Sequence, residues 1–266
     1  MERVRLLSSL WTMSFRAAMQ YRANFVMLVV MGLIYQGTGF AFIWVVLGRF
    51  PSLGGWTLGE VAFLYGLRLV MHALSMLGSG HGRVLGYQIQ RGEFDRYLLR
   101  PLPPLMQIMS QGVQVNAFGD LLGGLLLFGA AITLVGIDWS PQTLAYLVLA
   151  LIGGALLEIA LVLLIGALAL RVVDTGTLLF LHDTFFSSFG NYPLTVFGPA
   201  LRWLLTFALP LAFMAYFPAV VLLRRTGELS VPPTLAYGAP LIGALWFALA
   251  VAVFQRALRQ YQSVGH

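Results

Sequence analysis

Long apolar segments, separated by short polar or proline-containing stretches, cover most of this chain. The clearest of them approach or exceed the roughly 20 residues that a helix needs to cross a lipid bilayer. These clearest segments cover residues 25–47, 107–137, 144–170 and 235–254. A further segment, 61–78, is of similar length but less apolar, because it carries Arg68 and His72. We predict a membrane-spanning helix in each of these segments.

Residues 1–24 follow the pattern of an amphipathic helix. Apolar side chains recur on one arc of that helix: Val4, Leu7, Trp11, Phe15 and Ala18. Polar side chains occupy a separate arc: Arg5, Ser9, Thr12, Arg16 and Gln20. We therefore expect residues 1–24 to lie in the membrane interface, with Trp11 and Phe15 facing lipid. The alternative is a helix that caps the cytoplasmic face of the protein.

The stretch before the last span allows two topologies. Residues 174–197 are long enough to span but unusually polar, whereas residues 201–222 are apolar but interrupted by Pro210 and Pro218. Proline removes a backbone donor, and broken helices persist at membrane depth only against protein or a water-filled cavity. We therefore favour 174–197 as the fifth span and 201–222 as a re-entrant element on the outer side. In the alternative, 201–222 spans and 174–197 lies on the cytoplasmic face.

The composition supports an all-α polytopic membrane protein. Of the 266 residues, 59% are apolar and only 10% are charged, against roughly 25% charged residues in an ordinary soluble domain. A soluble fold of this length could not cover so much apolar surface with polar groups. We therefore expect residues 1–266 to form one transmembrane domain with six transmembrane helices, an N-terminal interfacial helix and a re-entrant hairpin before the last span.

Missing residue types exclude several kinds of chemistry. All 16 basic residues are arginine, so the chain has no lysine for a standard phosphate-binding P-loop or for a Schiff base. It has no cysteine, which excludes disulfides, thiolate nucleophiles and Cys-ligated metals. Its histidines, at positions 72, 81, 182 and 266, show no metal-ligand spacing. We therefore expect no catalytic residue, metal or cofactor in this chain.

The net charge of +6 is explained better by membrane topology than by nucleic-acid binding. If the N-terminus is cytoplasmic and six segments cross, most arginines fall on the cytoplasmic side, including those of segment 80–104. Cytoplasmic loops of membrane proteins carry such an excess of basic residues. We therefore expect both termini in the cytoplasm and no nucleic-acid partner.

Segment 80–104 is the most densely charged part of the chain and ends in a proline-rich run. It mixes both signs of charge with aromatic side chains, as protein-docking surfaces do. The residues that we single out for docking are Arg91, Glu93, Phe94, Asp95, Arg96, Tyr97 and Arg100. The plainer interpretation is a solvated loop whose arginines only set the topology.

Ionisable side chains inside the predicted spans are costly in lipid, so each needs a cavity or a partner. The candidates are Arg68, His72, Asp120, Glu158, His182 and Asp183. Arg68 and His72 are four residues apart and share one face of their helix. Some of these groups could line a transport pathway. For Arg68 and Glu158 we favour a structural pair, whereas for His182 and Asp183 both interpretations stay open.

Two stretches carry a resemblance to a known family: GEFDRYLLRPLPP (Gly92 to Pro104) and NYPLTVFGPALRWLLTFALPLAFMAYFPA (Asn191 to Ala219). With the N-terminal helix and the order of the spans, they resemble the permease subunit of bacterial ATP-binding-cassette (ABC) exporters of the ABC type-2 class. The resemblance covers nearly the whole chain.

The resemblance implies a six-span subunit in the lipid of the bacterial inner membrane. It would dimerise with an identical or paralogous permease, with the substrate pathway between the two. Separate cytoplasmic ATPase subunits would hold ATP and Mg²⁺, and segment 80–104 would dock onto them. Apart from the resemblance, Pro210 and Pro218 leave backbone carbonyls that only a protein-lined or water-filled cavity can satisfy. We expect such a cavity at the outer mouth to serve as the exit gate, with Tyr216 and Phe217 at its constriction.

A secondary transporter that couples export to protons through His72, Glu158 or Asp183 is the alternative function. Histidine and carboxylate side chains can relay protons at physiological pH. However, no internal inverted repeat is visible in the sequence, and folds of that kind usually show one. We therefore favour the ATP-driven exporter.

Overall fold

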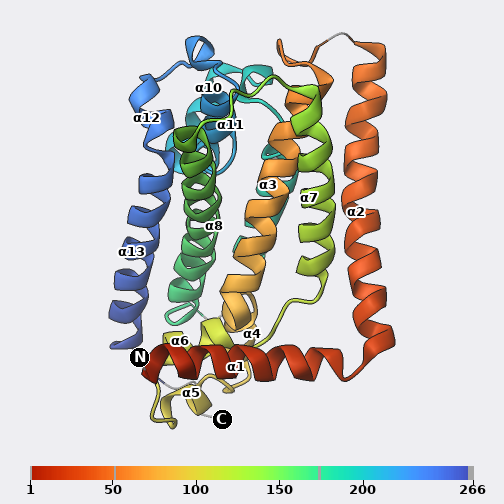
Figure 1. Ribbon diagram of the computed structural model, residues 1–266. Helices are drawn as coiled ribbons and strands as arrows, with labels where there is room; N and C mark the ends of the chain where they lie inside the picture. The colour runs from red at the N-terminus through yellow and green to blue at the C-terminus, as the bar shows by residue number, and fades with distance from the viewer. Residues whose placement is uncertain (1, 51, 173–174, 263–266) are drawn as a thin grey trace.

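The computed structural model describes residues 2–50, 52–172 and 175–262. Within these residues the chain is helical and has no strand, apart from one isolated bridge between Leu53 and Trp56. Long helices stand side by side in a bundle, and α1 (Glu2–Met19) lies across one end of it (Figure 1). The prediction of an all-α polytopic membrane protein is confirmed.

Five of the described helices are long and apolar enough to cross a membrane. They are α2 (Arg22–Arg49), α3 (Leu58–Ser79), α7 (Asn116–Leu134), α8 (Pro141–Ala169) and α13 (Ala239–Leu258). Four of them agree with their predicted spans to within a few residues. The predicted span 107–137 is instead two helices, α6 (Pro104–Ser110) and α7, because the chain breaks between them at Gly112. Gly112 has a φ of 75°, a conformation that glycine adopts most readily.

The starts of α3 and α8 are fixed by capping side chains. Thr57 accepts a hydrogen bond from the Glu60 backbone N–H, and the Glu60 carboxylate accepts one from the Thr57 N–H, which makes a capping box. Ser140 accepts from the Thr143 N–H, and Pro141 takes the first helical position. Both helices therefore begin at these caps, a few residues before the predicted spans and at the end of the bundle far from α1.

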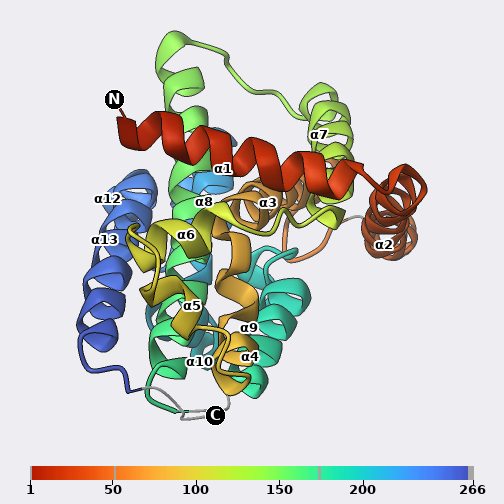
Figure 2. The same ribbon diagram turned by 90° about the horizontal axis from the view of Figure 1, so that it is seen from below.

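The end of the bundle that α1 crosses, which we call the α1 end, carries several short helices (Figure 2). They are η1 (Gly80–Val84), α4 (Leu85–Gln90), α5 (Asp95–Leu98) and α6. The predicted loop 80–104 is therefore largely helical. The first part of this segment is helical because the apolar helical segment that begins with α3 extends through η1 and α4, from Leu58 to Gln90.

Helix α1 packs on this end with part of its apolar face. The ring of Phe15 lies 6.1 Å from that of Phe25 in α2 and 5.7 Å from that of Phe118 in α7. Ser14 Oγ donates to the carbonyl of Ser110. Phe15 is therefore partly buried against an aromatic surface formed by the first turns of α2 and α7. Trp11 is partly exposed beside it.

The segment after α8 runs from the α1 end to the opposite end of the bundle. Thr175, just before α9 (Gly176–Phe189), adjoins Gly86 of α4. Farther on, Thr195 Oγ1 donates to the carbonyl of Gly54 in the loop between α2 and α3. The predicted fifth span is thus a 14-residue helix followed by an irregular stretch, and its first residue, 174, lies outside the described residues. Pro193 explains why no single long helix forms, since proline ends helices.

The irregular stretch contains η2 (Leu194–Val196) and leads into two helical pieces that bend by 74° against each other. The first piece is α10 (Pro199–Trp203) with the π-helical turn η3 (Leu204–Ala208), and the second is η4 (Leu211–Phe213) with α11 (Tyr216–Leu222). The bend falls at Pro210, and the chain then returns through η5 (Thr226–Glu228) and α12 (Pro233–Tyr237) to α13.

Both ends of this bent pair lie at the end of the bundle opposite α1. Arg202 donates to the carbonyls of Thr195 and Phe197. Arg224, just beyond α11, forms an ion pair with Asp138 in the loop between α7 and α8. A full span would place its two ends at opposite ends of the bundle. The geometry is therefore that of a hairpin, which agrees with the favoured topology for residues 201–222.

Candidate functional site

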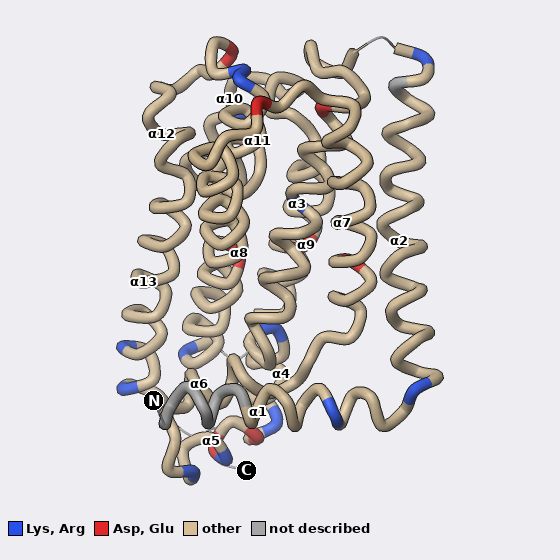
Figure 3. Tube along the Cα trace, in the orientation of Figure 1, with Lys and Arg blue, Asp and Glu red and all other residues tan. Residues whose placement is uncertain are grey.

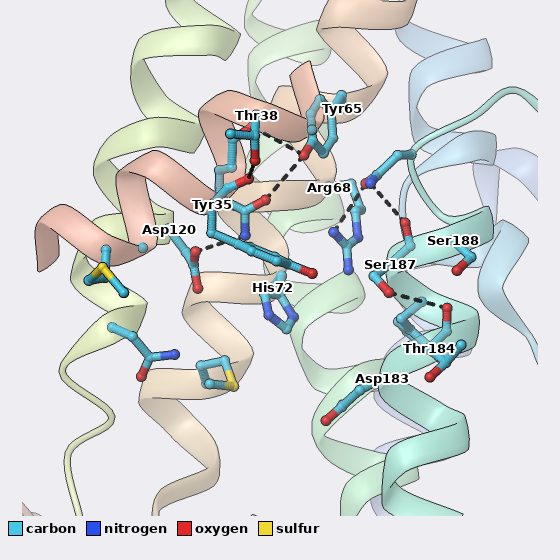
Figure 4. Close-up of a pocket in the computed structure, with 18 of the residues that line it drawn as sticks. Tyr35, Thr38, Tyr65, Arg68, His72, Asp120, Asp183, Thr184, Ser187 and Ser188 are labelled. Atoms are coloured by element: carbon cyan, nitrogen blue, oxygen red, sulfur yellow. Dashed lines mark hydrogen bonds between the residues drawn. The ribbon is translucent and has the colours of Figure 1, made fainter. Parts of the chain in front are cut away.

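A cavity of about 860 Å³ lies between α2, α3, α7 and α9 (Figure 4). Apolar side chains such as Leu28, Met31 and Phe180 form part of its wall. Its polar lining consists of Tyr35, Gln36, Thr38, Tyr65, Arg68, His72, Arg83, Asn116, Asp120, Asp183, Thr184, Ser187, Ser188, Asn191 and Tyr192. A cavity of this size and mixed lining, at the depth of the long helices, suits a small amphipathic molecule.

Four of the six ionisable side chains singled out in the sequence line this cavity: Arg68, His72, Asp120 and Asp183. Glu158 lies behind the wall and is fully buried. The ring of His182 stacks on Phe186 at 4.2 Å, and its Nδ1 lies 3.0 Å from Asp183 Oδ1. The structure thus brings most of the predicted groups to one place, although they come from four different helices.

Glu158 is the fully buried member of a group of charges that we call the Arg83 cluster: His72, Arg83, Glu158 and the half-exposed Asp183. The Nδ1 of His72 lies 2.6 Å from Glu158 Oε1, and Arg83 Nη2 lies 3.4 Å from the same oxygen. Arg83 Nη1 lies 2.7 Å from Asp183 Oδ1. Because these residues belong to α3, η1, α8 and α9, the Arg83 cluster ties the four elements together.

The expected pair of Arg68 and Glu158 does not form. Arg68 Nη1 donates instead to Asn191 Oδ1 at 3.1 Å. Glu158 lies level with His72, one turn nearer the α1 end than Arg68, and its remaining cationic partner is Arg83. The sequence interpretation missed Arg83 because it assigned this residue to a loop. Arg83 lies beyond Gly80, whose φ of 50° ends the α-helix before η1, so no helical spacing in the sequence joins Arg83 to His72.

A second polar chain joins α2, α3 and α7 across the cavity. Gln36 Nε2 donates to Asp120 Oδ1 at 2.8 Å, and the Tyr65 hydroxyl donates to Gln36 Oε1 at 3.1 Å. Asp120 therefore satisfies its buried carboxylate with a neutral amide. Asn116, one helical turn before Asp120 in α7, also lines the cavity.

The predicted docking residues of segment 80–104 divide into a buried and an exposed set. Phe94 and Tyr97 are buried, so the prediction that they form a docking surface is wrong. Phe94 packs on Tyr261 near the C-terminal end of α13, at 4.9 Å between ring centroids, and the Tyr261 hydroxyl donates to Asp95 Oδ1. Burial raises the pKa of Tyr97. The rings of Phe94 and Tyr97 fold inward because α13 and the end of α8 offer them an apolar surface.

The exposed set forms what we call the α4–α5 surface: Tyr87, Arg91, Arg96, Leu98, Leu99 and Arg100. Leu99 is 84% exposed, and the Arg91 guanidinium lies 4.6 Å from the centroid of the Tyr87 ring. Glu93 sits at its edge in an ion pair with Arg96 at 3.2 Å. The arginines of the predicted docking set all belong to this surface, whereas the sequence interpretation missed Leu99. Exposed leucines between arginines are typical of a surface that binds another protein.

The two residues predicted at an outer gate are packed inside the protein. The ring of Tyr216 lies 5.8 Å from that of Trp56, and the ring of Phe217 lies 4.8 Å from that of Phe213. Neither side chain lines the cavity. The hairpin packs on itself and on the α2–α3 loop at these rings, and the assignment of Tyr216 and Phe217 to an outer gate stays a prediction.

No group of three or more His, Asp or Glu side chains in the described residues is arranged to hold a metal ion. Residues 33–265 match a family described as ABC-2 family transporter protein. No curated protein and no solved structure matches the chain.

Proposed function

The chain belongs to the ABC-2 family of transporter proteins, and on that premise we propose that it is the permease subunit of an ATP-driven exporter. Separate ATPase subunits hold ATP and Mg²⁺ and supply the energy, and this chain supplies the route through the membrane. The chain has no lysine for a P-loop, which accords with that division of labour.

The α1 end faces the cytoplasm in this proposal. Basic residues gather there, while fewer lie at the opposite end (Figure 3). The described arginines of the α1 end are Arg16, Arg22, Arg83, Arg91, Arg96, Arg100, Arg171, Arg256 and Arg259. An excess of basic residues marks the cytoplasmic side of inner-membrane proteins. Helix α1 then lies along the cytoplasmic interface, and the hairpin of α10 and α11 lies near the outer face.

The α4–α5 surface is the proposed docking site for the ATPase. It projects from the α1 end, and α4 continues directly from α3 through η1. A displacement of this surface is therefore passed to α3 and, through Arg83, to α8 and α9. This continuity from an exposed surface to the charges beside the cavity is the observation that carries the proposal.

The cavity is half of the proposed pathway. Helices α2 and α9, which form two of its walls, have few buried residues and so expose much of their surface. A second permease, identical or paralogous, can cover this exposed surface. Exposed apolar side chains along α2, among them Met27, Met31 and Trp44, suit contact with a second chain or with lipid.

Replacing Leu99 with aspartate tests the docking assignment. The tagged chain is isolated from its native host, and the copurifying ATPase and its ATP hydrolysis are measured. A buried charge at the centre of an interface should reduce copurification about tenfold or more. Gln142→Asp introduces the same residue at an exposed site at the far end of the bundle and should behave like the wild type.

Undiminished copurification of the Leu99→Asp variant would remove the docking assignment. Uptake or export driven by a pH gradient alone, with the purified chain and no ATPase, would instead favour the proton-coupled alternative through the Arg83 cluster.

A further inference from the structure

Arg68 is a buried cation with no acidic side chain at ion-pair distance among the described residues, although it lies close enough to Glu158 for Coulomb attraction. It lies midway along α3, is 3% exposed and lines the cavity. Its recorded hydrogen bond goes to a neutral acceptor, Asn191 Oδ1, and its Nε has no partner among the described residues. A buried cation that is not neutralised is costly at membrane depth, so such a group marks a place where a counter-charge binds.

The carboxylates near the cavity are engaged elsewhere. Glu158 is held by His72 and Arg83, and Asp183 by Arg83 and His182. Asp120 accepts from the Gln36 amide, and Figure 4 shows it on a different wall of the cavity from Arg68. None of these carboxylates is within ion-pair distance of Arg68 in the described residues. A counter-ion in direct contact with Arg68 would therefore come from a molecule inside the cavity.

The surroundings of Arg68 are built to hold its guanidinium in place. Asn191 Nδ2 donates to the carbonyl of Ser187 at 2.9 Å, which turns its Oδ1 toward Arg68. Ser187 and Thr184 of α9 line the same part of the cavity, as Figure 4 shows. A guanidinium presents its donors as a planar fork that matches phosphate and carboxylate oxygens. The Thr184 and Ser187 hydroxyls beside it donate to the carbonyls of Phe180 and Thr184 within α9, and each would turn to donate to a head group.

We propose that the cavity binds an amphipathic molecule by its anionic head group, a phosphate or a carboxylate, with Arg68 as the counter-ion. The head group lies between Arg68 and the hydroxyl groups of α9, away from Asp120. The apolar part lies along Leu28 and Met31 of α2. The molecule is either a lipid of the surrounding bilayer or the exported cargo. The inference names the ligand class for the proposed permease pathway and so rests on the proposed function.

Binding to the purified chain, with no ATPase present, tests this inference separately from the transport function. Dodecyl phosphate is titrated against dodecyl maltoside, its neutral counterpart, and dodecyltrimethylammonium, its cationic counterpart, with thermal stabilisation and equilibrium binding as readouts. We expect saturable binding of the phosphate compound only. Arg68→Gln should weaken that binding about tenfold or more, since it removes both the charge and the fork.

Two control variants distinguish a specific loss of binding from misfolding and from a general effect of charge. Arg68→Lys keeps the charge without the fork and should bind with intermediate affinity. Arg256→Gln removes an exposed arginine outside the cavity and should bind like the wild type. Equal binding by the wild type and by Arg68→Gln, or by Arg68→Lys if the glutamine variant does not fold, would overturn the inference. Equal stabilisation by all three compounds would do the same.

Native mass spectrometry of the chain from nanodiscs separates the two sources of the anion. Retention of phosphatidylglycerol over phosphatidylcholine by the wild type, and its loss in Arg68→Gln, assigns the site to a membrane lipid. Binding of dodecyl phosphate without selective retention of an anionic lipid assigns it to cargo. If the chain neither binds dodecyl phosphate nor retains an anionic lipid selectively, the inference is overturned. The proposed function can still hold in that case, because it is tested separately by copurification of the ATPase.

Discussion

Helices α13 and α9 both pack on α8, but they are attached to it in different ways. Gly153 of α8 meets Gly243 and Pro240 of α13 so closely that a Cβ on Gly243 would lie 2.0 Å from the Gly153 carbonyl oxygen. Phe254, Ala250 and Ala257 complete a buried seam. In α9, by contrast, Phe186 is the buried residue, and Arg83 joins Asp183 to Glu158.

The two attachments differ in how many arrangements they permit. Where two helices pack with their backbones in contact, any shift between them breaks many van der Waals contacts at once. We therefore expect α8 and α13 to move as one rigid unit. Ion pairs and hydrogen bonds can be exchanged for others nearby, so α9 can adopt a second position. A small cavity of about 180 Å³ between α4, α8 and the start of α9 gives it room. We infer that α9 is the moving wall of the proposed pathway.

The largest effect is expected from filling the seam between α8 and α13. Gly243→Leu forces side-chain atoms into the backbone of Gly153, so most of the chain should fail to fold. Monodisperse yield in detergent and resistance to proteolysis measure this. The matched control is Gly129→Leu in α7, where a Cβ meets nothing within 4 Å. Similar yields for the two variants would mean that the seam is not rigid.

A smaller loss is expected from Arg83→Met, which removes the link between α8 and α9. Glu158 keeps His72 but loses its second cation, so the free energy of unfolding should fall toward the low end of the roughly 3–5 kcal/mol seen for broken buried pairs. Amide exchange should accelerate in α9 and stay slow in α13. Equal acceleration in both helices would show that the two attachments do not differ.

The smallest effect is expected from Asp183→Asn. Its carboxylate is half exposed, so the ion pair with Arg83 contributes about 1 kcal/mol or less. The melting temperature should hardly change, whereas exchange in α9 should still rise because one of its anchors is weakened. A drop in melting temperature as large as that of Arg83→Met would assign Asp183 a structural role like that of Glu158.

The apolar pattern predicted the long helices well because hydrophobic length alone selects a membrane-spanning helix. It also indicated the hairpin, since Pro210 and Pro218 break one short stretch. It could not identify the partner of Glu158, which depends on how α3 continues into η1. The inward rings of Phe94 and Tyr97 were equally hidden, because the α13 residue Phe254 and the later Tyr261 that cover this region lie more than 150 residues away in sequence. Contacts between distant segments leave no local pattern.

The movement of α9 can be tested most directly with a reversible tether at its start. A Cβ on Gly86 of α4 would lie 4.0 Å from the Thr175 Cβ and 3.8 Å from the Ala169 Cβ at the end of α8, both within disulfide range. The chain has no cysteine of its own, so the pairs Gly86→Cys with Thr175→Cys and Gly86→Cys with Ala169→Cys can be compared without background. ATP hydrolysis of the reconstituted permease–ATPase complex is measured in the oxidised and the reduced state. We predict that oxidation stops hydrolysis in the pair that tethers α9, that reductant restores it, and that the pair that joins α4 to α8 works in both states. Full hydrolysis with the disulfide to Thr175 formed would contradict the claim that α9 moves.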